Sequence, residues 1–158
     1  VGGGHPGYLV RQDPTALALY GVSLGGYVTS LTTCFDGDLD AVIAGIPVCD
    51  FPALFALQSP RHVRERAVQH GILEGNVEQV HRVVSPLAIP CQVPEDRRFI
   101  FAGLGDRMAV PAQATALWEH WNRPSIRWFP GNHVGFLWSS KVGDYVDGVL
   151  SGALERAA

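Results

Sequence analysis

The chain has 158 residues, of which 47% are hydrophobic and 17% charged, and its net charge is −3. This length predicts a single domain, residues 1–158, and the acidic balance without a basic cluster argues against a nucleic-acid partner. Apolar runs end well before the roughly 18 residues that a membrane span requires, so we expect none. The first residues do not resemble a signal peptide, and three widely spaced cysteines are typical of free buried thiols. We therefore expect a cytoplasmic location.

Apolar runs alternate with helix-compatible stretches along the chain. In chain order the pattern predicts a strand at 16–22, a helix at 24–35, a strand at 40–48, short helices near 60–72 and 76–84, a strand at 98–103, a helix at 111–121, a strand at 126–129 and a helix at 139–155. Such alternation is typical of a parallel sheet in an α/β fold. The segment 51–93 interrupts it and is expected to form a cap-like helical insertion.

The segment 21–26 reads Gly-Val-Ser-Leu-Gly-Gly and joins the first predicted strand to the first predicted helix. This is the context of a nucleophile elbow, a sharp turn that holds a serine in a strained backbone conformation. Glycine is expected at positions 21 and 25 because a Cβ at either would clash in so tight a turn. We predict that Ser23 is a nucleophile and that the N–H of Leu24 faces an oxyanion.

A serine nucleophile needs a base, and the base needs an acid that orients it. In parallel sheets such groups lie beyond the carboxyl ends of the strands. Asp106 follows the strand at 98–103, and His133 follows the strand at 126–129, each in a glycine-containing loop. The chain order of serine, aspartate and histidine is also the order typical of this kind of elbow. We predict that Ser23, Asp106 and His133 form a catalytic triad.

Other acids and histidines are weaker candidates. Asp50 follows the strand at 40–48 and is the second choice for the acid, while Asp106 could instead cap the helix at 111–121 or close a turn. The remaining candidate histidines lie on predicted helices: His62, His70, His81 and His120. Their spacing fits no metal site, and we expect neither a metal nor a cofactor.

From about residue 16 onward, the chain resembles the C-terminal half of an α/β-hydrolase. The matching motifs lie at 21–26, at 102–106 with Pro111, and at 131–136. The stretches 40–50 and 85–87 are similar to the domain 18-like branch of that superfamily.

The resemblance implies a three-layer parallel sheet and acyl hydrolysis without a cofactor. It implies that Ser23 is the nucleophile, His133 the base and Asp106 its partner. By analogy, the four predicted strands correspond to the last four of an eight-stranded sheet, so we expect a truncated sheet with a small helical cap. The fold does not determine the substrate.

Two expectations follow from the truncation. The strand at 16–22 and part of one sheet face should expose apolar surface, which predicts a homodimer or a longer parent chain. The second oxyanion donor normally comes from a loop far upstream, and the glycine-rich segment 2–7 is too close to Ser23 to supply it. We therefore expect an incomplete oxyanion hole and weak activity.

The expected reaction is hydrolysis of a small to medium carboxylic ester, a small-molecule substrate, through an acyl-enzyme. Four aromatic residues are expected to line an apolar acyl pocket, although core packing would explain them equally well: Phe51, Phe55, Phe136 and Trp138. Two alternatives stay open, an acyltransferase or peptidase with the same triad and a non-catalytic hydrolase-like interaction protein.

Overall fold

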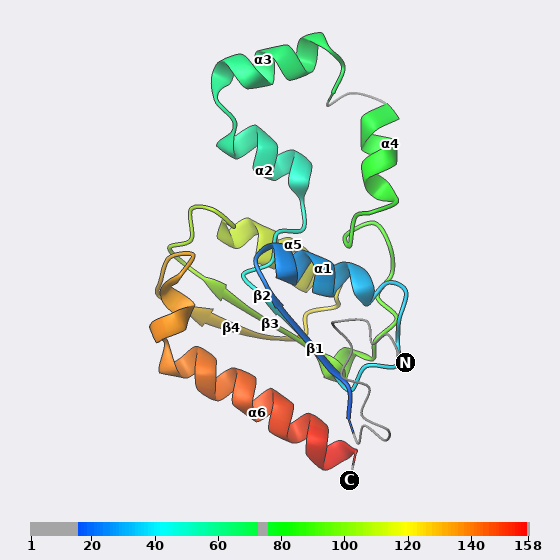
Figure 1. Cartoon of the computed structure of the whole chain (residues 1–158), viewed down its shortest axis with the longest axis vertical. Coiled ribbons are helices and arrows are strands. Elements are labelled where there is room, and N and C mark those ends of the chain that lie inside the picture. Colours follow the sequence, from blue (N-terminus) through cyan, green and yellow to red (C-terminus); the bar gives the residue numbers. More distant parts are fainter. Residues whose placement is uncertain (1–15, 73–75, 158) are drawn as a thin grey trace, which may run out of the picture.

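The computed structural model describes residues 16–72 and 76–157. At its centre is a parallel sheet of four strands in the order β1-β2-β3-β4 (Figure 1). The strands are β1 (Ala18–Val22), β2 (Ala41–Gly45), β3 (Arg98–Gly103) and β4 (Ser125–Phe129). Because all pairings are parallel, the carboxyl ends of the four strands meet at one end of the sheet. The α/β fold class and the four strands expected from the sequence are confirmed.

The strand β2 is buried along its whole length. Its uninterrupted apolar sequence predicts this, because a strand covered on both faces needs no polar side. Val42 and Ala44 face one hydrophobic cluster, and Ala41 and Ile43 face another. The sheet therefore separates two apolar layers, as the alternation of side chains along a strand requires.

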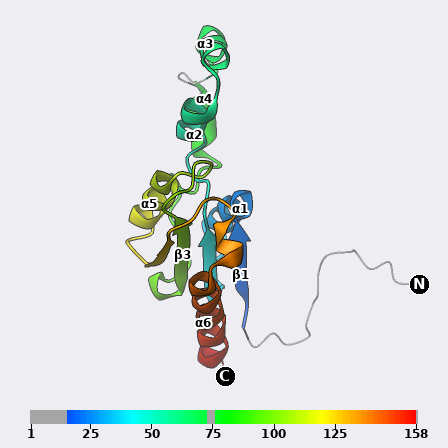
Figure 2. The same ribbon diagram turned by 90° about the vertical axis from the view of Figure 1, so that its left-hand side faces the viewer.

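Helices cover both faces of the sheet and produce three layers. They are α1 (Leu24–Thr32) and α5 (Pro111–His120) above the sheet in Figure 1, and α6 (Ser140–Arg156) below it (Figures 1 and 2). Leu117 of α5 packs in the cluster that contains Ile100 of β3. Val149 of α6 packs in the opposite cluster with Phe101.

Three further helices extend away from the sheet beyond the carboxyl ends of the strands (Figures 1 and 2). They are α2 (Phe51–Gln58), α3 (Arg61–Gln69) and α4 (Asn76–Arg82). The sequence predicts α3 and α4 within a few residues but not α2. The start of α2 is set by Asp50, whose side chain accepts the N–H of Ala53, and by Pro52 in the first turn.

The remaining helical elements are short 3-10 turns, Glu95–Arg97 before β3 and Gly135–Trp138 after β4. Within the described residues, no helix combines the length and the apolar character needed to cross a bilayer.

Candidate active site

Ser23 lies in the turn between β1 and α1. Its backbone has a φ of 59° and a ψ of −116°, a positive-φ conformation that a non-glycine residue adopts only at a cost. The N–H of Ser23 donates to the carbonyl of Gly45, at the end of β2, over 2.9 Å. The neighbouring strand therefore holds the turn in place, and the strained serine conformation predicted from the motif is present.

The glycines around Ser23 have different roles. A Cβ on Gly21 would overlap the carbonyl oxygen of Gly25, as the sequence predicts. A Cβ on Gly25 would meet nothing within 4 Å, so the expected clash at this position is wrong. The close approach falls one residue later, because α1 crosses the end of β2 there. A Cβ on Gly26 would lie 2.8 Å from the carbonyl oxygen of Gly45.

His133 lies between Ser23 and Asp106. Its Nε2 is 3.0 Å from Ser23 Oγ, and its Nδ1 is 2.7 Å from Asp106 Oδ2. The Asp106 side chain is fully buried, whereas 17% of the His133 side chain is exposed. Because a carboxylate only accepts hydrogen bonds, Nδ1 carries the proton and Nε2 is free to accept one from the serine hydroxyl. Three side chains predicted from separate loops are thus brought together.

Two hydrogen bonds join the loops that carry the acid and the base. The N–H of Leu104 donates to the carbonyl of Phe129 over 2.9 Å, and the N–H of Gly105 donates to that of Gly131 over 3.0 Å. A Cβ on Gly103 would lie 2.6 Å from the Gly131 carbonyl oxygen. Glycine is therefore required for the close approach that places the carboxylate beside the imidazole.

The second carboxylate oxygen of Asp106 closes its own loop. Oδ1 accepts the N–H of Met108 over 2.8 Å and the N–H of Ala109 over 3.0 Å. Asp106 therefore also closes a turn, as the sequence allowed. It does not cap α5, because Val110 occupies the N-cap position without a side-chain hydrogen bond.

Leu24 is the first residue of α1. Among the described residues its N–H has no hydrogen-bond acceptor, as expected for the first amide of a helix. This amide stands directly after Ser23 and is free to bind an oxyanion. The glycine-rich segment 2–7, considered above as a second donor, lies outside the described residues.

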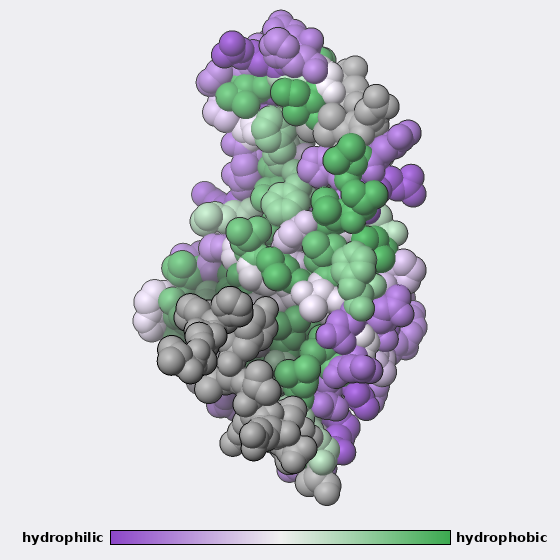
Figure 3. Space-filling view, turned by 45° about the vertical axis from the view of Figure 1, so that its right-hand side comes forward, coloured by the Kyte–Doolittle hydropathy of each residue, from purple (hydrophilic) through white to green (hydrophobic). Residues whose placement is uncertain are grey.

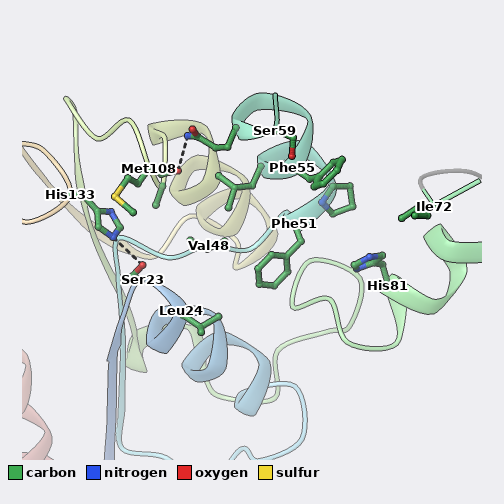
Figure 4. A pocket seen from close by; sticks show the side chains of 14 residues that line it. Ser23, Leu24, Val48, Phe51, Phe55, Ser59, Ile72, His81, Met108 and His133 are labelled. Atoms are coloured by element: carbon green, nitrogen blue, oxygen red, sulfur yellow. Dashed lines mark hydrogen bonds between the residues drawn. The ribbon is translucent and has the colours of Figure 1, made fainter. Parts of the chain in front are cut away.

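A cleft of about 720 Å³ extends from Ser23 and His133 along α2. In Figure 4 these two side chains lie at one end, and Ile72 and His81 at the other. The other lining residues are mostly apolar: Leu24, Val48, Phe51, Pro52, Leu54, Phe55, Gln58, Ser59, Met108 and Ala109. Val48 and Met108 were missed in the sequence, although they follow strands at the same end as Asp106.

The four aromatic residues expected in the pocket are divided between two places. Phe51 and Phe55 line the cleft. Phe136 does not; its ring centroid lies 5.8 Å from that of Phe101, and it packs against the cluster between the sheet and α6. Trp138 does not line the cleft either and is 78% exposed. The 3-10 turn after His133 directs these two side chains elsewhere.

The weaker candidates have other partners or positions. Asp50 caps α2, and His120 Nε2 lies 3.0 Å from the carbonyl oxygen of Ile89. His62 is exposed on α3 and does not lie in any of the three loops that carry Ser23, Asp106 and His133. Among the described residues, no group of three or more His, Cys, Asp or Glu side chains could hold a metal ion.

No protein-family model matches the chain. Its sequence is 38% identical over 149 residues to uncharacterised proteins from two strains of Mycobacterium tuberculosis. The alignment covers 92% of this chain, which spans about a third (35%) of the length of these relatives. The similarity to the domain 18-like branch therefore stays a prediction.

Solved structures show the fold. An acetyl xylan esterase from Paenibacillus sp. R4 superposes with a TM-score of 0.64 and 17% identity, over 85% of this chain and 44% of that one. An acylaminoacyl peptidase from Pyrococcus horikoshii superposes with a TM-score of 0.59 and 15% identity, over 79% of this chain and 21% of that one. The chain has an α/β-hydrolase fold. Its four strands cover part of the α/β-hydrolase fold of these neighbours, in agreement with the expected truncation.

Proposed function

We propose that the chain is a serine hydrolase that cleaves carboxylic esters through an acyl-enzyme. The observation that carries this proposal is the continuous chain of hydrogen bonds from Ser23 Oγ through His133 to the buried Asp106. Structural neighbours that share the fold include esterases and peptidases, which supports a hydrolase.

The proposed reaction begins with attack of Ser23 Oγ on the ester carbonyl carbon. The hydroxyl proton passes to His133 Nε2, while Asp106 accepts the Nδ1–H and stabilises the imidazolium. The N–H of Leu24 donates to the oxyanion of the tetrahedral intermediate. Collapse breaks the C–O bond, and His133 returns the proton to the departing alcohol. Water, activated by the same histidine, then hydrolyses the acyl-enzyme.

The cleft favours an apolar acyl group. Among its described lining residues there is no Lys, Arg, Asp or Glu side chain. A charged acyl group would lose its hydration there with no lysine, arginine or carboxylate among these residues to pair with. The volume of about 720 Å³ is within the range of small-molecule sites. We propose uncharged esters with small to medium acyl chains as the substrate class.

The proposal is tested by reacting the folded protein with a fluorophosphonate and locating the adduct by mass spectrometry. We expect one adduct on the peptide that contains Ser23, which must be separated from the peptide of Ser59 because that serine also lines the cleft. Ser23→Ala should abolish the adduct, and His133→Ala should slow its formation by about 10²-fold or more. His62→Ala, a change on the exposed face of α3, should leave the rate unchanged.

The outcomes separate the alternatives. No adduct on folded protein would contradict the proposal and favour a non-catalytic interaction protein. An adduct on Ser23 with faster turnover of amides than of esters would favour a peptidase, and transfer to an added alcohol in preference to water would favour an acyltransferase.

A further inference from the structure

The helix α2 forms one wall of the cleft, yet none of its residues is buried. Burial of apolar side chains is the usual source of helix packing energy, and in α2 it is only partial, at Phe51, Leu54 and Phe55. One aromatic contact is present, an edge-to-face pair between Phe51 and Tyr27 with ring centroids 4.8 Å apart. Polar contacts at the two ends of α2 therefore have a substantial part in fixing its position relative to Ser23.

The contact at the start of α2 is made by Gln113, a side chain of α5 that is only 3% exposed. Its Oε1 accepts the N–H of Cys49 over 2.8 Å and that of Asp50 over 2.7 Å. Its Nε2 donates to the carbonyl of Asp50 over 3.0 Å. One buried amide thus fixes the three successive peptide groups that lead into α2, and Asp50 in turn caps the helix.

The contact at the end of α2 is made by Gln58. Its Nε2 donates to the carbonyl of Arg107 and, over 3.4 Å, to that of Met108. These carbonyls belong to the loop that Asp106 closes with its Oδ1. The two glutamines therefore connect both ends of the cleft wall to the α5 side of the molecule, where the Asp106 loop lies.

We propose that Gln113 is a positioning residue that sets the acyl-chain selectivity of the cleft by fixing the start of α2, with Gln58 supporting the other end. This inference rests on the proposed function. Val48 and Phe51 flank the two residues that Gln113 holds, and both line the cleft. A shift of this backbone would move the wall relative to Ser23, and an error of about 1 Å in substrate placement can cost about 10²-fold in rate.

Selectivity distinguishes this role from a contribution to stability alone. Figure 4 places Ser23 at one end of the cleft, Ile72 at the other and Phe55 between them. An acetyl group occupies only the end beside Ser23, whereas an octanoyl group must lie along α2. Misplacement of α2 should therefore penalise the long ester more than the short one, and a general loss of stability should not.

The experiment measures kcat/KM for p-nitrophenyl octanoate and p-nitrophenyl acetate and compares their ratio among variants. Gln113→Met has a similar shape and removes all three hydrogen bonds; Gln113→Glu keeps an acceptor for the two N–H groups. Gln58→Met tests the other end at an exposed position. Val149→Ala, in the cluster below the sheet, controls for destabilisation, and Gln79→Met on α4 controls for loss of an exposed amide.

We expect the octanoate-to-acetate ratio to fall about tenfold in Gln113→Met, less in Gln58→Met, and to an intermediate value in Gln113→Glu. The two control variants should keep the ratio within about twofold of the wild type. Active enzyme with an unchanged ratio in Gln113→Met would overturn the inference and leave the proposed function intact. A wild-type protein that hydrolyses neither ester and takes no fluorophosphonate would overturn both.

Discussion

Asp106 uses its two carboxylate oxygens for different tasks. Oδ2 faces His133 Nδ1, while Oδ1 accepts the N–H groups of Met108 and Ala109. A buried carboxylate with three hydrogen bonds is well compensated for its loss of hydration. The same side chain therefore shapes its loop and determines which imidazole nitrogen carries the proton.

We predict that Asp106→Asn keeps the loop but reduces ester turnover by about 10⁴-fold. The amide oxygen can still accept the two backbone N–H groups, whereas the amide nitrogen would face His133 Nδ1 as a donor. Nε2 would then carry the proton and could not accept one from Ser23. The measurement is kcat with p-nitrophenyl acetate, together with a thermal melt. Asp147→Asn, on the exposed face of α6, is the matched control; an Asp106→Asn variant with more than about a tenth of wild-type kcat would contradict the proposed role.

Cys49 is a buried thiol next to the cleft wall. Burial raises the pKa of Cys49 from its ordinary value of 9.0 to about 12. Between these values the unfolded chain loses the thiol proton and the folded chain keeps it. Folding stability is therefore full below pH 9 and falls as the pH rises toward 12.

We predict that wild-type protein loses more stability between pH 8 and pH 10.5 than Cys49→Ala does, by about 1–2 kcal/mol. Urea unfolding at the two pH values measures this difference. Tyrosines also titrate in this range, and comparison with the variant removes their contribution. Equal losses in the two proteins would show that Cys49 is not protected from ionisation.

The position of Ser23 depends on how α1 packs against the end of β2. Gly26 is where α1 crosses the end of β2, whereas Gly25 faces open space. We predict that Gly26→Ala lowers the free energy of unfolding by about 1–3 kcal/mol, because the helix must move away from the strand. Gly25→Ala should raise it by up to about 1 kcal/mol, because alanine is the better helix former.

Urea melts of these two variants provide the measurement, and each controls for the other because the positions are adjacent. Equal destabilisation in both variants would show that the tight turn requires glycine at both positions. The crossing of α1 over β2 would then not be the reason for Gly26.

The sequence predicts the sheet better than the helix that forms the cleft wall. The strand Arg98–Gly103 is a short, mostly apolar run that ends in glycine, and the structure has it with the predicted bounds. The eight residues of α2 read FPALFALQ, almost all apolar, so they show no helical period. The helix lies outside the core, and its apolar side chains line the cleft instead.

In the candidate site, too, some residues could be placed from the sequence and others could not. Asp106 and His133 could be predicted because each follows a strand at the end of the sheet where the carboxyl ends meet. Phe136 and Trp138 were assigned to the cleft because they follow His133, but a 3-10 turn sends one into the core and leaves the other exposed. Such a turn depends on packing against α6, which the local sequence does not specify. The catalytic roles stay predictions.

The whole molecule exposes apolar surface beside the edge strand. In the described part of the chain, β1 pairs only with β2. Exposed apolar side chains lie on or just before β1, on α1 and around the end of α4: Leu17, Tyr20, Leu24, Val28, Val80 and Val83. Figure 3 shows apolar surface in the middle of the face that includes this side of the molecule. An unpaired edge next to apolar surface favours association.

The exposed surface is expected to pair in a homodimer or to be covered within a longer parent chain. For the homodimer, the light-scattering mass should be about twice the 17.1 kDa of the chain. Val28→Lys should shift the mass toward that of the monomer, because a charge would be buried in the interface. Leu154→Lys on α6, at a similarly exposed position, should not. A monodisperse monomer at micromolar concentration would contradict this expectation.

The absence of buried side chains in α2 has a consequence for how this protein can change during evolution. Substitutions in a packed core are selected against because they destabilise the fold, and that constraint is weak along this helix. Mutations of Leu54 or Phe55 can therefore accumulate at little cost in stability while they alter the wall of the cleft. In a library randomised at these two positions, most members should stay folded, and some should have new acyl preferences. The sheet and the side chains of Ser23, Asp106 and His133 would be unchanged.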